Sequence, residues 1–172
     1  MWVQWLEDRA DFFTLFESLL RFAHRALYDR RLAAEVRMPE AEFQRDLRGH
    51  LQADPSIGAR HWEAPRLGGG ITDLGLGKIV LELKVEHDKP VTLESAAAYM
   101  SQPAQYAAGV DRQVSILCIL DDSEKTSPPG SLANYMGWLV PTLHGLDNPS
   151  YPSIVAVLIV PTKFPVPSGW SR

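Results

Sequence analysis

Three charged residues, Asp73, Glu82 and Lys84, interrupt an apolar stretch that otherwise favours β-strands. Strands are enriched in branched and aromatic residues, and charged side chains are seldom buried there without a partner. Two carboxylates and one ammonium in a small patch are groups with which proteins bind a divalent metal and hydrolyse phosphodiesters. The three residue types therefore predict a metal-dependent hydrolytic site, provided that the chain brings them together.

A β-hairpin turning at Gly77 and Lys78 would bring them together. Glycine suits the first position of such a two-residue turn, and counting along the ladder from this turn places Asp73 opposite Glu82. Directly opposed residues have Cβ atoms about 5 Å apart. Side chains alternate between the two faces of a strand. We therefore expect Lys84 to share the face of Glu82, beside Asp73.

A solvated hairpin face with cross-strand charge pairs is the simpler interpretation of the same residues. It accounts well for Glu82 and Lys84. It does not explain Asp73 opposite Glu82, because like charges directly opposite each other destabilise a sheet.

The composition is that of an ordinary globular domain: 172 residues, of which 45% are hydrophobic and 22% charged. The formal net charge of −4 argues against passive binding of nucleic acid by a polycation. Arginines nevertheless gather in the stretch 21–60 before the hairpin, and two interpretations stay open: solvated helix faces or contacts to phosphate.

The one cysteine, Cys118, lies in an apolar run and is expected to be a buried structural thiol rather than a nucleophile. A reducing, cytoplasmic location fits this cysteine usage. Charged residues interrupt the N-terminal apolar residues, so we expect no secretory leader. No run approaches the roughly 20 apolar residues of a membrane span, so no membrane association is expected.

The order of predicted elements defines the fold class. Helical periodicity and capping residues predict helices at 11–29, 39–52, 92–100, 101–108 and 131–143. A short strand at 61–64 precedes the hairpin, and continuous apolar runs predict buried strands at 114–120 and 153–160. We expect an α/β fold with a mixed central sheet flanked by helices on both faces. It forms a single domain, 1–172, with a helical extension at 1–30 and a core at 39–160.

Two helices carry further candidate residues. Gln102 and Tyr106 lie four residues apart at the start of a helix and therefore share one side of it. Glu40 begins an earlier helix on the face of Phe43 and Leu47. A plain acidic residue at a helix N-terminus is the alternative interpretation of Glu40.

These residues resemble the PD-(D/E)XK nuclease superfamily, whose members have the restriction-endonuclease-like fold. Asp73 matches the motif Asp, and Glu82-Leu83-Lys84 matches Glu-x-Lys. The segment 102–106 matches the Gln-x-x-x-Tyr element of RecB-type members, and Glu40 matches the acid on the helix before the sheet. Thr72 replaces the Pro that names the motif. The resemblance covers about 39–160.

The resemblance implies a hydrolase: a DNA-binding, metal-binding nuclease with magnesium or manganese as its cofactor. The metal ligands would be Asp73, Glu82, the backbone carbonyl of Leu83, and Glu40. Lys84 would position the attacking water, and Gln102 and Tyr106 would orient the site or contact substrate phosphate.

Other interpretations stay open beside this one. The chain could be a nucleic-acid-binding or assembly module with the same fold and little activity, or an RNase. A homodimer or a protein partner could use the aromatic N-terminal helix. Four histidines, His50, His61, His87 and His144, show no metal-ligand spacing. We expect them to lie on the surface or to pack against neighbouring side chains. The acidic segment 121–124 predicts a solvated loop in preference to a cation site.

Overall fold

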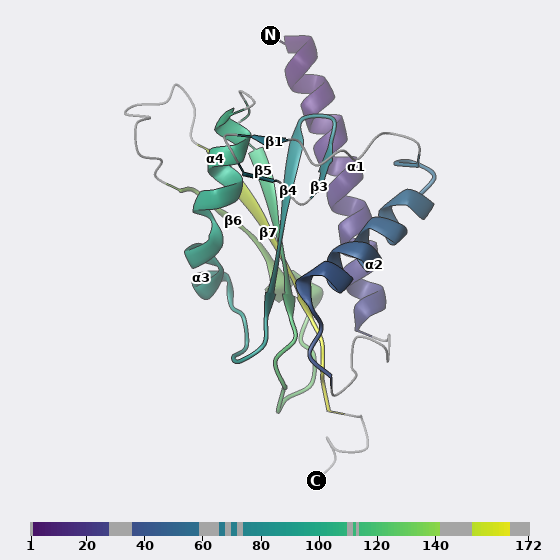
Figure 1. Cartoon of the computed structure of the whole chain (residues 1–172), viewed down its shortest axis with the longest axis vertical. Coiled ribbons are helices and arrows are strands. Elements are labelled where there is room, and N and C mark those ends of the chain that lie inside the picture. Colours follow the sequence, from purple (N-terminus) through teal and green to yellow (C-terminus); the bar gives the residue numbers. More distant parts are fainter. Residues whose placement is uncertain are drawn as a thin grey trace.

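The computed structural model describes residues 2–27, 36–58, 66–67, 70–71, 74–109, 112, 114–141 and 153–165. These residues fold as a mixed five-stranded sheet with helices on both of its faces (Figure 1). This confirms the predicted α/β class. The strand predicted at 61–64 lies outside the described residues.

The sheet has the strand order β3-β4-β5-β7-β6. Its elements are β3 (Leu74–Leu76), β4 (Ile79–Glu86), β5 (Val114–Asp121), β7 (Ile154–Pro161) and β6 (Met136–Leu139). The three central strands are parallel, and β3 and β6 pair antiparallel to their neighbours. Helices cover both faces of β5 and β7, which explains why their sequences are apolar without interruption. A separate two-stranded ribbon joins β1 (Arg66–Leu67) to β2 (Gly70–Ile71).

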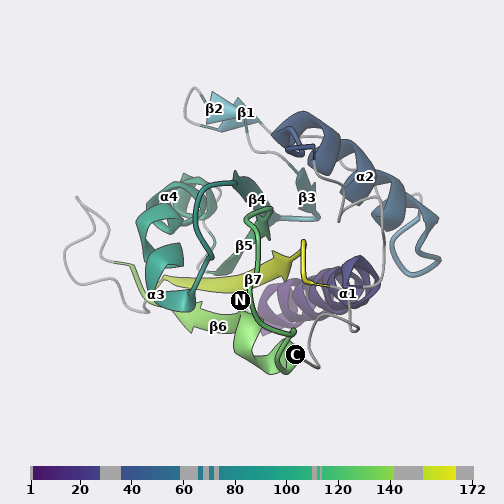
Figure 2. The ribbon, with the colours of Figure 1, turned by 90° about the horizontal axis from the view of Figure 1, so that it is seen from below.

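Helices α1 (Trp2–Ala26) and α2 (Glu40–Ala53) cover one face of the sheet (Figure 2). Leu15 and Leu19 of α1 and Phe43 of α2 are fully buried in the same cluster as Leu81 and Leu83 of β4. Helix α1, expected as an extension outside the core, is therefore an integral layer of it. Its apolar residues recur at helical spacing because one side of the helix packs on the sheet.

The opposite face carries α3 (Leu93–Ala96), the 3₁₀ helix η1 (Ala97–Tyr99) and α4 (Ser101–Gly109). Thr92 caps α3, as predicted, and its hydroxyl accepts a hydrogen bond from the Ser95 amide while the Ser95 side chain accepts one from Thr92. The expected continuous helix at 92–100 ends as a 3₁₀ turn, and α4 begins at Ser101 with Pro103 in its first turn.

The helix predicted at 131–143 is wrong over the residues that the structure describes. Ser131 does cap a helix, but this is the single 3₁₀ turn η2 (Leu132–Tyr135), and the chain then enters β6. Gly137 disfavours a helix interior, and β6 gains backbone hydrogen bonds by pairing with the edge of β7. A capping residue indicates where a helix begins. The end of this helix depends on the pairing of β6 with β7, which follows later in the chain.

Candidate functional site

The hairpin predicted around Gly77 is present. Gly77 has φ 57°, a conformation that glycine adopts without steric cost. The ladder that leads from this turn toward Asp73 and Glu82 is formed as counted, with the pairs Leu76 and Ile79, Gly75 and Val80, and Leu74 and Leu81. Asp73 is the next residue in this register but lies outside the described residues, so its pairing with Glu82 stays a prediction.

Strand β4 divides its side chains between two layers, as alternation requires. Leu81 and Leu83 pack in the cluster with α1 and α2. Glu82 and Lys84 therefore point to the other face, which α3, η1 and α4 cover. Leu83 was proposed as a metal ligand through its backbone carbonyl alone, so the burial of its side chain does not affect that role.

Glu82 is almost completely buried, with 1% of its surface exposed. Its Oε1 atom lies 2.9 Å from Nζ of Lys84, whose side chain is 24% exposed. A buried carboxylate needs such a cation, because removing it from water costs several kcal/mol. The solvated-face interpretation is thus wrong for Glu82, and the ion pair sits in the interior between β4 and its covering helices.

Gln102 and Tyr106 lie on α4, which packs against β4 and β5. Nε2 of Gln102 donates a hydrogen bond to the Tyr106 hydroxyl at 3.3 Å, and both side chains are half-buried. This confirms that the two residues share one side of the helix. The structure therefore places them in the layer that covers the Glu82 face of the sheet.

Glu40 is the exposed first residue of α2. Phe43 and Leu47 of the same helix are buried in the cluster on the face opposite to Glu82. The structure thus places Glu40 in the helix layer behind the sheet, at a helix N-terminus where an acid is favourable in its own right.

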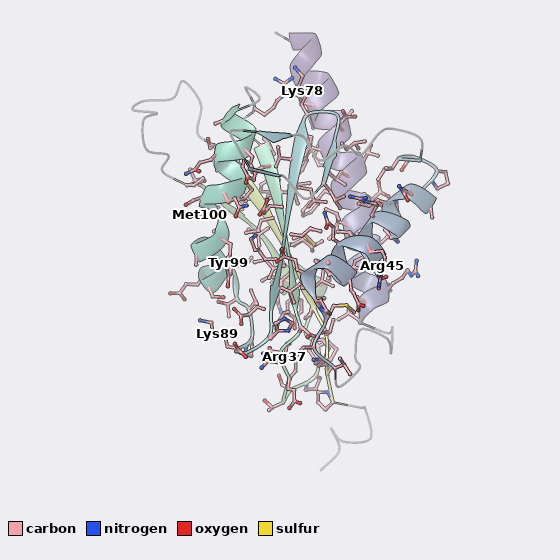
Figure 3. All side chains as sticks on the ribbon, viewed as in Figure 1. Arg37, Arg45, Lys78, Lys89, Tyr99 and Met100 are labelled. Atoms are coloured by element: carbon pink, nitrogen blue, oxygen red, sulfur yellow. The ribbon has the colours of Figure 1, made fainter. Side chains whose placement is uncertain are left out.

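Glu86 follows Glu82 and Lys84 on the same face of β4, and Tyr99 of η1 binds it. The Tyr99 hydroxyl donates to Oε2 of Glu86 at 3.0 Å, and the backbone amides of His87 and Asp88 donate to Oε1 at 3.1 Å and 3.0 Å. The Asp88 amide is the main cause that lowers the pKa of Glu86, against the effect of burial. The bond to Glu86 likewise raises the pKa of Tyr99. Alternation indicated the direction of Glu86, but no sequence signal indicated Tyr99, which Figure 3 shows on the helical layer beside β4.

The solvated loop predicted at 121–124 is wrong for its first three residues, because Asp121, Asp122 and Ser123 are buried. Oδ1 of Asp121 accepts from Nζ of Lys125 at 2.8 Å and from the Ser123 hydroxyl at 2.6 Å. Its Oδ2 atom accepts from the amide of Val91 at 2.9 Å. Burial is the main cause that lowers the pKa of Lys125.

Asp122 ties together three further segments at the same ends of the strands. Its Oδ2 atom accepts from the amide of Met38 and contacts Nδ1 of His87, both at 2.9 Å. Its Oδ1 atom lies 3.1 Å from Nζ of Lys163. Each aspartate thus has a lysine partner, so the structure gives these carboxylates a role in joining segments.

Several arginines before the hairpin have acidic partners. Oδ2 of Asp54 accepts from Arg21 at 2.5 Å, and the other ion pairs join Arg21 to Glu17, Arg37 to Asp88 and Arg45 to Glu42. Arg37 lies near the lower ends of the strands and Arg45 on α2 (Figure 3). For Arg21, Arg37 and Arg45, this neutralisation favours solvated helix faces over a phosphate-binding patch.

The donor set on β4 suits a hard divalent cation in its chemistry. Mg²⁺ and Mn²⁺ prefer carboxylate and carbonyl oxygens, and Glu82 with the carbonyl of Leu83 supplies both kinds. Among the described residues, no three His, Cys, Asp or Glu side chains gather as a metal-binding group. A site of this kind would therefore draw on Asp73, which lies outside them.

Cys118 is fully buried, and burial raises the pKa of its thiol to about 12, which confirms a structural role. Within the described ranges, none of the helices has the length and apolar character needed to cross a bilayer. Comparisons with family models, curated proteins and solved structures found no match.

Proposed function

We propose that this protein is a metal-dependent nuclease with a restriction-endonuclease-like fold that hydrolyses phosphodiester bonds in DNA, in a reducing, cytoplasmic setting. The observation that carries the proposal is the Glu82–Lys84 pair, a buried carboxylate with an ammonium 2.9 Å away. It lies on the sheet face beneath the helix that bears Gln102 and Tyr106. Buried ion pairs also join segments of this fold, at Asp121 and Asp122. The Glu82–Lys84 pair differs from them because the layer above its sheet face carries the polar side chains of Gln102 and Tyr106.

Phosphodiester hydrolysis requires positive charge near the phosphate and an activated water. Bound Mg²⁺ or Mn²⁺ would supply both, held by Glu82, the Leu83 carbonyl and Asp73; Glu40 is left out of this ligand set because it begins a helix on the opposite face of the sheet. Lys84 is held in place by Glu82 and can orient a water molecule and offset developing negative charge. The amide of Gln102 and the hydroxyl of Tyr106 can donate hydrogen bonds to phosphate oxygens.

A nucleic-acid-binding or assembly module is the second candidate, and one surface favours it. Phe13 of α1 and Trp138 of β6 are 54% and 59% exposed. Phe12 packs against both of them, and Phe16 packs against Phe12 and Trp138. Contiguous exposed apolar residues often mark interaction surfaces. A homodimer or a protein partner could dock there, through α1.

The test is cleavage by the purified full chain of supercoiled, linear and single-stranded DNA and of RNA, with Mg²⁺, Mn²⁺ or EDTA. We expect metal-dependent cleavage of DNA that is lost in Asp73→Ala and Lys84→Ala. Lys78→Ala is the matched control, because Lys78 is an exposed lysine at the turn of the same hairpin. Cleavage that survives both site substitutions would contradict the site. Cleavage of RNA alone would identify an RNase, and binding without cleavage would favour the module.

A further inference from the structure

Lys84 lies between two carboxylates on one face of β4. Same-face neighbours along a strand are about 7 Å apart, so Glu82 and Glu86 are equally near to Lys84 along the backbone. The flexible four-carbon stem of lysine can reach either neighbour. Sequence alone therefore leaves open which carboxylate receives the ammonium, whereas the structure pairs Lys84 with Glu82 at 2.9 Å.

The carboxylate of Glu86 is already occupied by three donors. Two are the backbone amides of His87 and Asp88, which both bind Oε1. The third is the Tyr99 hydroxyl, which binds Oε2 at 3.0 Å. Because the pKa of Tyr99 is raised above its ordinary value, this phenol is protonated at neutral pH and remains a donor.

We propose that Tyr99 and Glu86 are positioning residues that direct Lys84 to Glu82. Three hydrogen bonds satisfy most of the acceptor capacity of one carboxylate and weaken its pull on a nearby ammonium. The charge of Lys84 acts slightly against the rise in the pKa of Tyr99, so the ammonium and the phenol influence each other electrostatically. Loss of that hydroxyl leaves Oε2 of Glu86 open to Lys84.

The effect on activity rests on the proposed nuclease function, whereas the choice of ion pair does not. We expect Tyr99→Phe to lower kcat/KM for DNA cleavage by about tenfold, since small misplacements of reacting groups cost one to two orders of magnitude. Adding Glu86→Gln should restore most of that loss, because a neutral amide does not compete for the ammonium. Tyr135→Phe, which removes a phenol packed elsewhere on the same sheet face, should behave as the wild type.

The double variant Tyr99→Phe/Glu86→Gln distinguishes a positioning role of Tyr99 from a purely structural one. If Tyr99 only fastened the helical layer to β4, Glu86→Gln would not restore activity to Tyr99→Phe. That result would overturn the proposal. Thermal unfolding of each variant checks that all of them fold.

Metal-free crystal structures provide a readout that needs no activity. In Tyr99→Phe, Nζ of Lys84 should move from Glu82 toward Glu86, and in the double variant it should return. If the wild type cleaves no nucleic acid but Lys84 moves as expected, the proposed function fails and the positioning role stands. If the wild type cleaves DNA and Lys84 stays on Glu82 in Tyr99→Phe, the positioning role fails alone.

Discussion

At the scale of single residues, the Glu82 carboxylate lies in the interior of the α/β sandwich, beneath the layer of α3, η1 and α4. Only 1% of the surface of Glu82 is exposed, and the ammonium of Lys84 compensates its charge. Glu86, two residues further along the same face, receives neutral donors instead. Glu82 and Glu86 are both neighbours of Lys84 on one strand, but they have different partners. The ammonium of Lys84 is therefore paired with Glu82 and not shared equally between the two carboxylates.

Lys84→Ala should therefore affect stability as well as activity. Removing one member of a fully buried pair costs about 3–5 kcal/mol, and we expect about 2 kcal/mol here because Lys84 is partly exposed. Chemical denaturation measures the free energy of unfolding. Lys78→Ala, at the exposed turn, should change it by less than about 0.5 kcal/mol. Equal stabilities for the two variants would show that Glu82 does not need Lys84.

The sequence predicted the residues that local rules govern. Alternation and the glycine turn were enough to place Glu82 and Lys84 on one face and to set the register of the hairpin. The partner of Glu86 was not predictable, because Tyr99 reaches it only after α3 and η1 fold back over β4. Asp121 was misjudged for the same reason: a charge appears solvated in sequence until other segments cover it.

At the scale of elements, the two helices on the α1 side are joined through the end of α2. Asp54 follows α2 directly and accepts hydrogen bonds from Arg21 of α1 and from the amide and hydroxyl of Ser56. Hydrogen bonds from the hydroxyls of Ser18 and Ser56 are the main causes that hold the pKa of Asp54 well below its ordinary value. One carboxylate therefore connects the C-terminus of α2 with the C-terminal half of α1.

This arrangement predicts a pH dependence of stability. Because the pKa of Asp54 is lower in the folded chain than in the unfolded chain, folding favours the ionised form. The stabilisation is fully present above the unfolded value of about 4 and is lost as the pH falls below it. Asp54→Asn should lower the melting temperature at pH 7 and reduce its fall on acidification. Melting curves from pH 7 to pH 3 test this, and parallel profiles for the two proteins would contradict it.

The edge strand β6 lies in a segment for which the sequence predicted a helix. Ser131 and the apolar residues after it suggested a helix, yet the chain makes one 3₁₀ turn and joins β7. Propensity is a local preference, whereas pairing with β7 depends on a strand that follows much later in the chain. The same pairing adds one of the two antiparallel edges of the mixed sheet, and β3 forms the other.

At the scale of the whole molecule, the carboxyl ends of β4, β5 and β7 meet in a buried network of charges. Asp121 binds the amide of Val91 just before α3, and Asp122 binds the amide of Met38 just before α2. The carbonyl of Asp121 also accepts from Thr162 after β7. Two adjacent aspartates thus fasten the entries to both helix layers onto the central strand.

Asp121→Asn tests this role across the fold. The substitution leaves the Lys125 ammonium, whose side chain is 8% exposed, without its anionic partner, and we expect a loss of about 3–5 kcal/mol in the free energy of unfolding. Asp88→Asn is the matched control, because the Asp88 carboxylate is 75% exposed in its pair with Arg37, and surface pairs contribute about 0–1 kcal/mol. Adding Lys125→Met to Asp121→Asn should recover part of the loss, because the unpaired charge is gone.

Since Asp121 also accepts a hydrogen bond from the amide of Val91, hydrogen exchange in Asp121→Asn should increase in α3 and α4 as well as in β5. Increased exchange confined to the end of β5 would mean that the network fastens only its own strand.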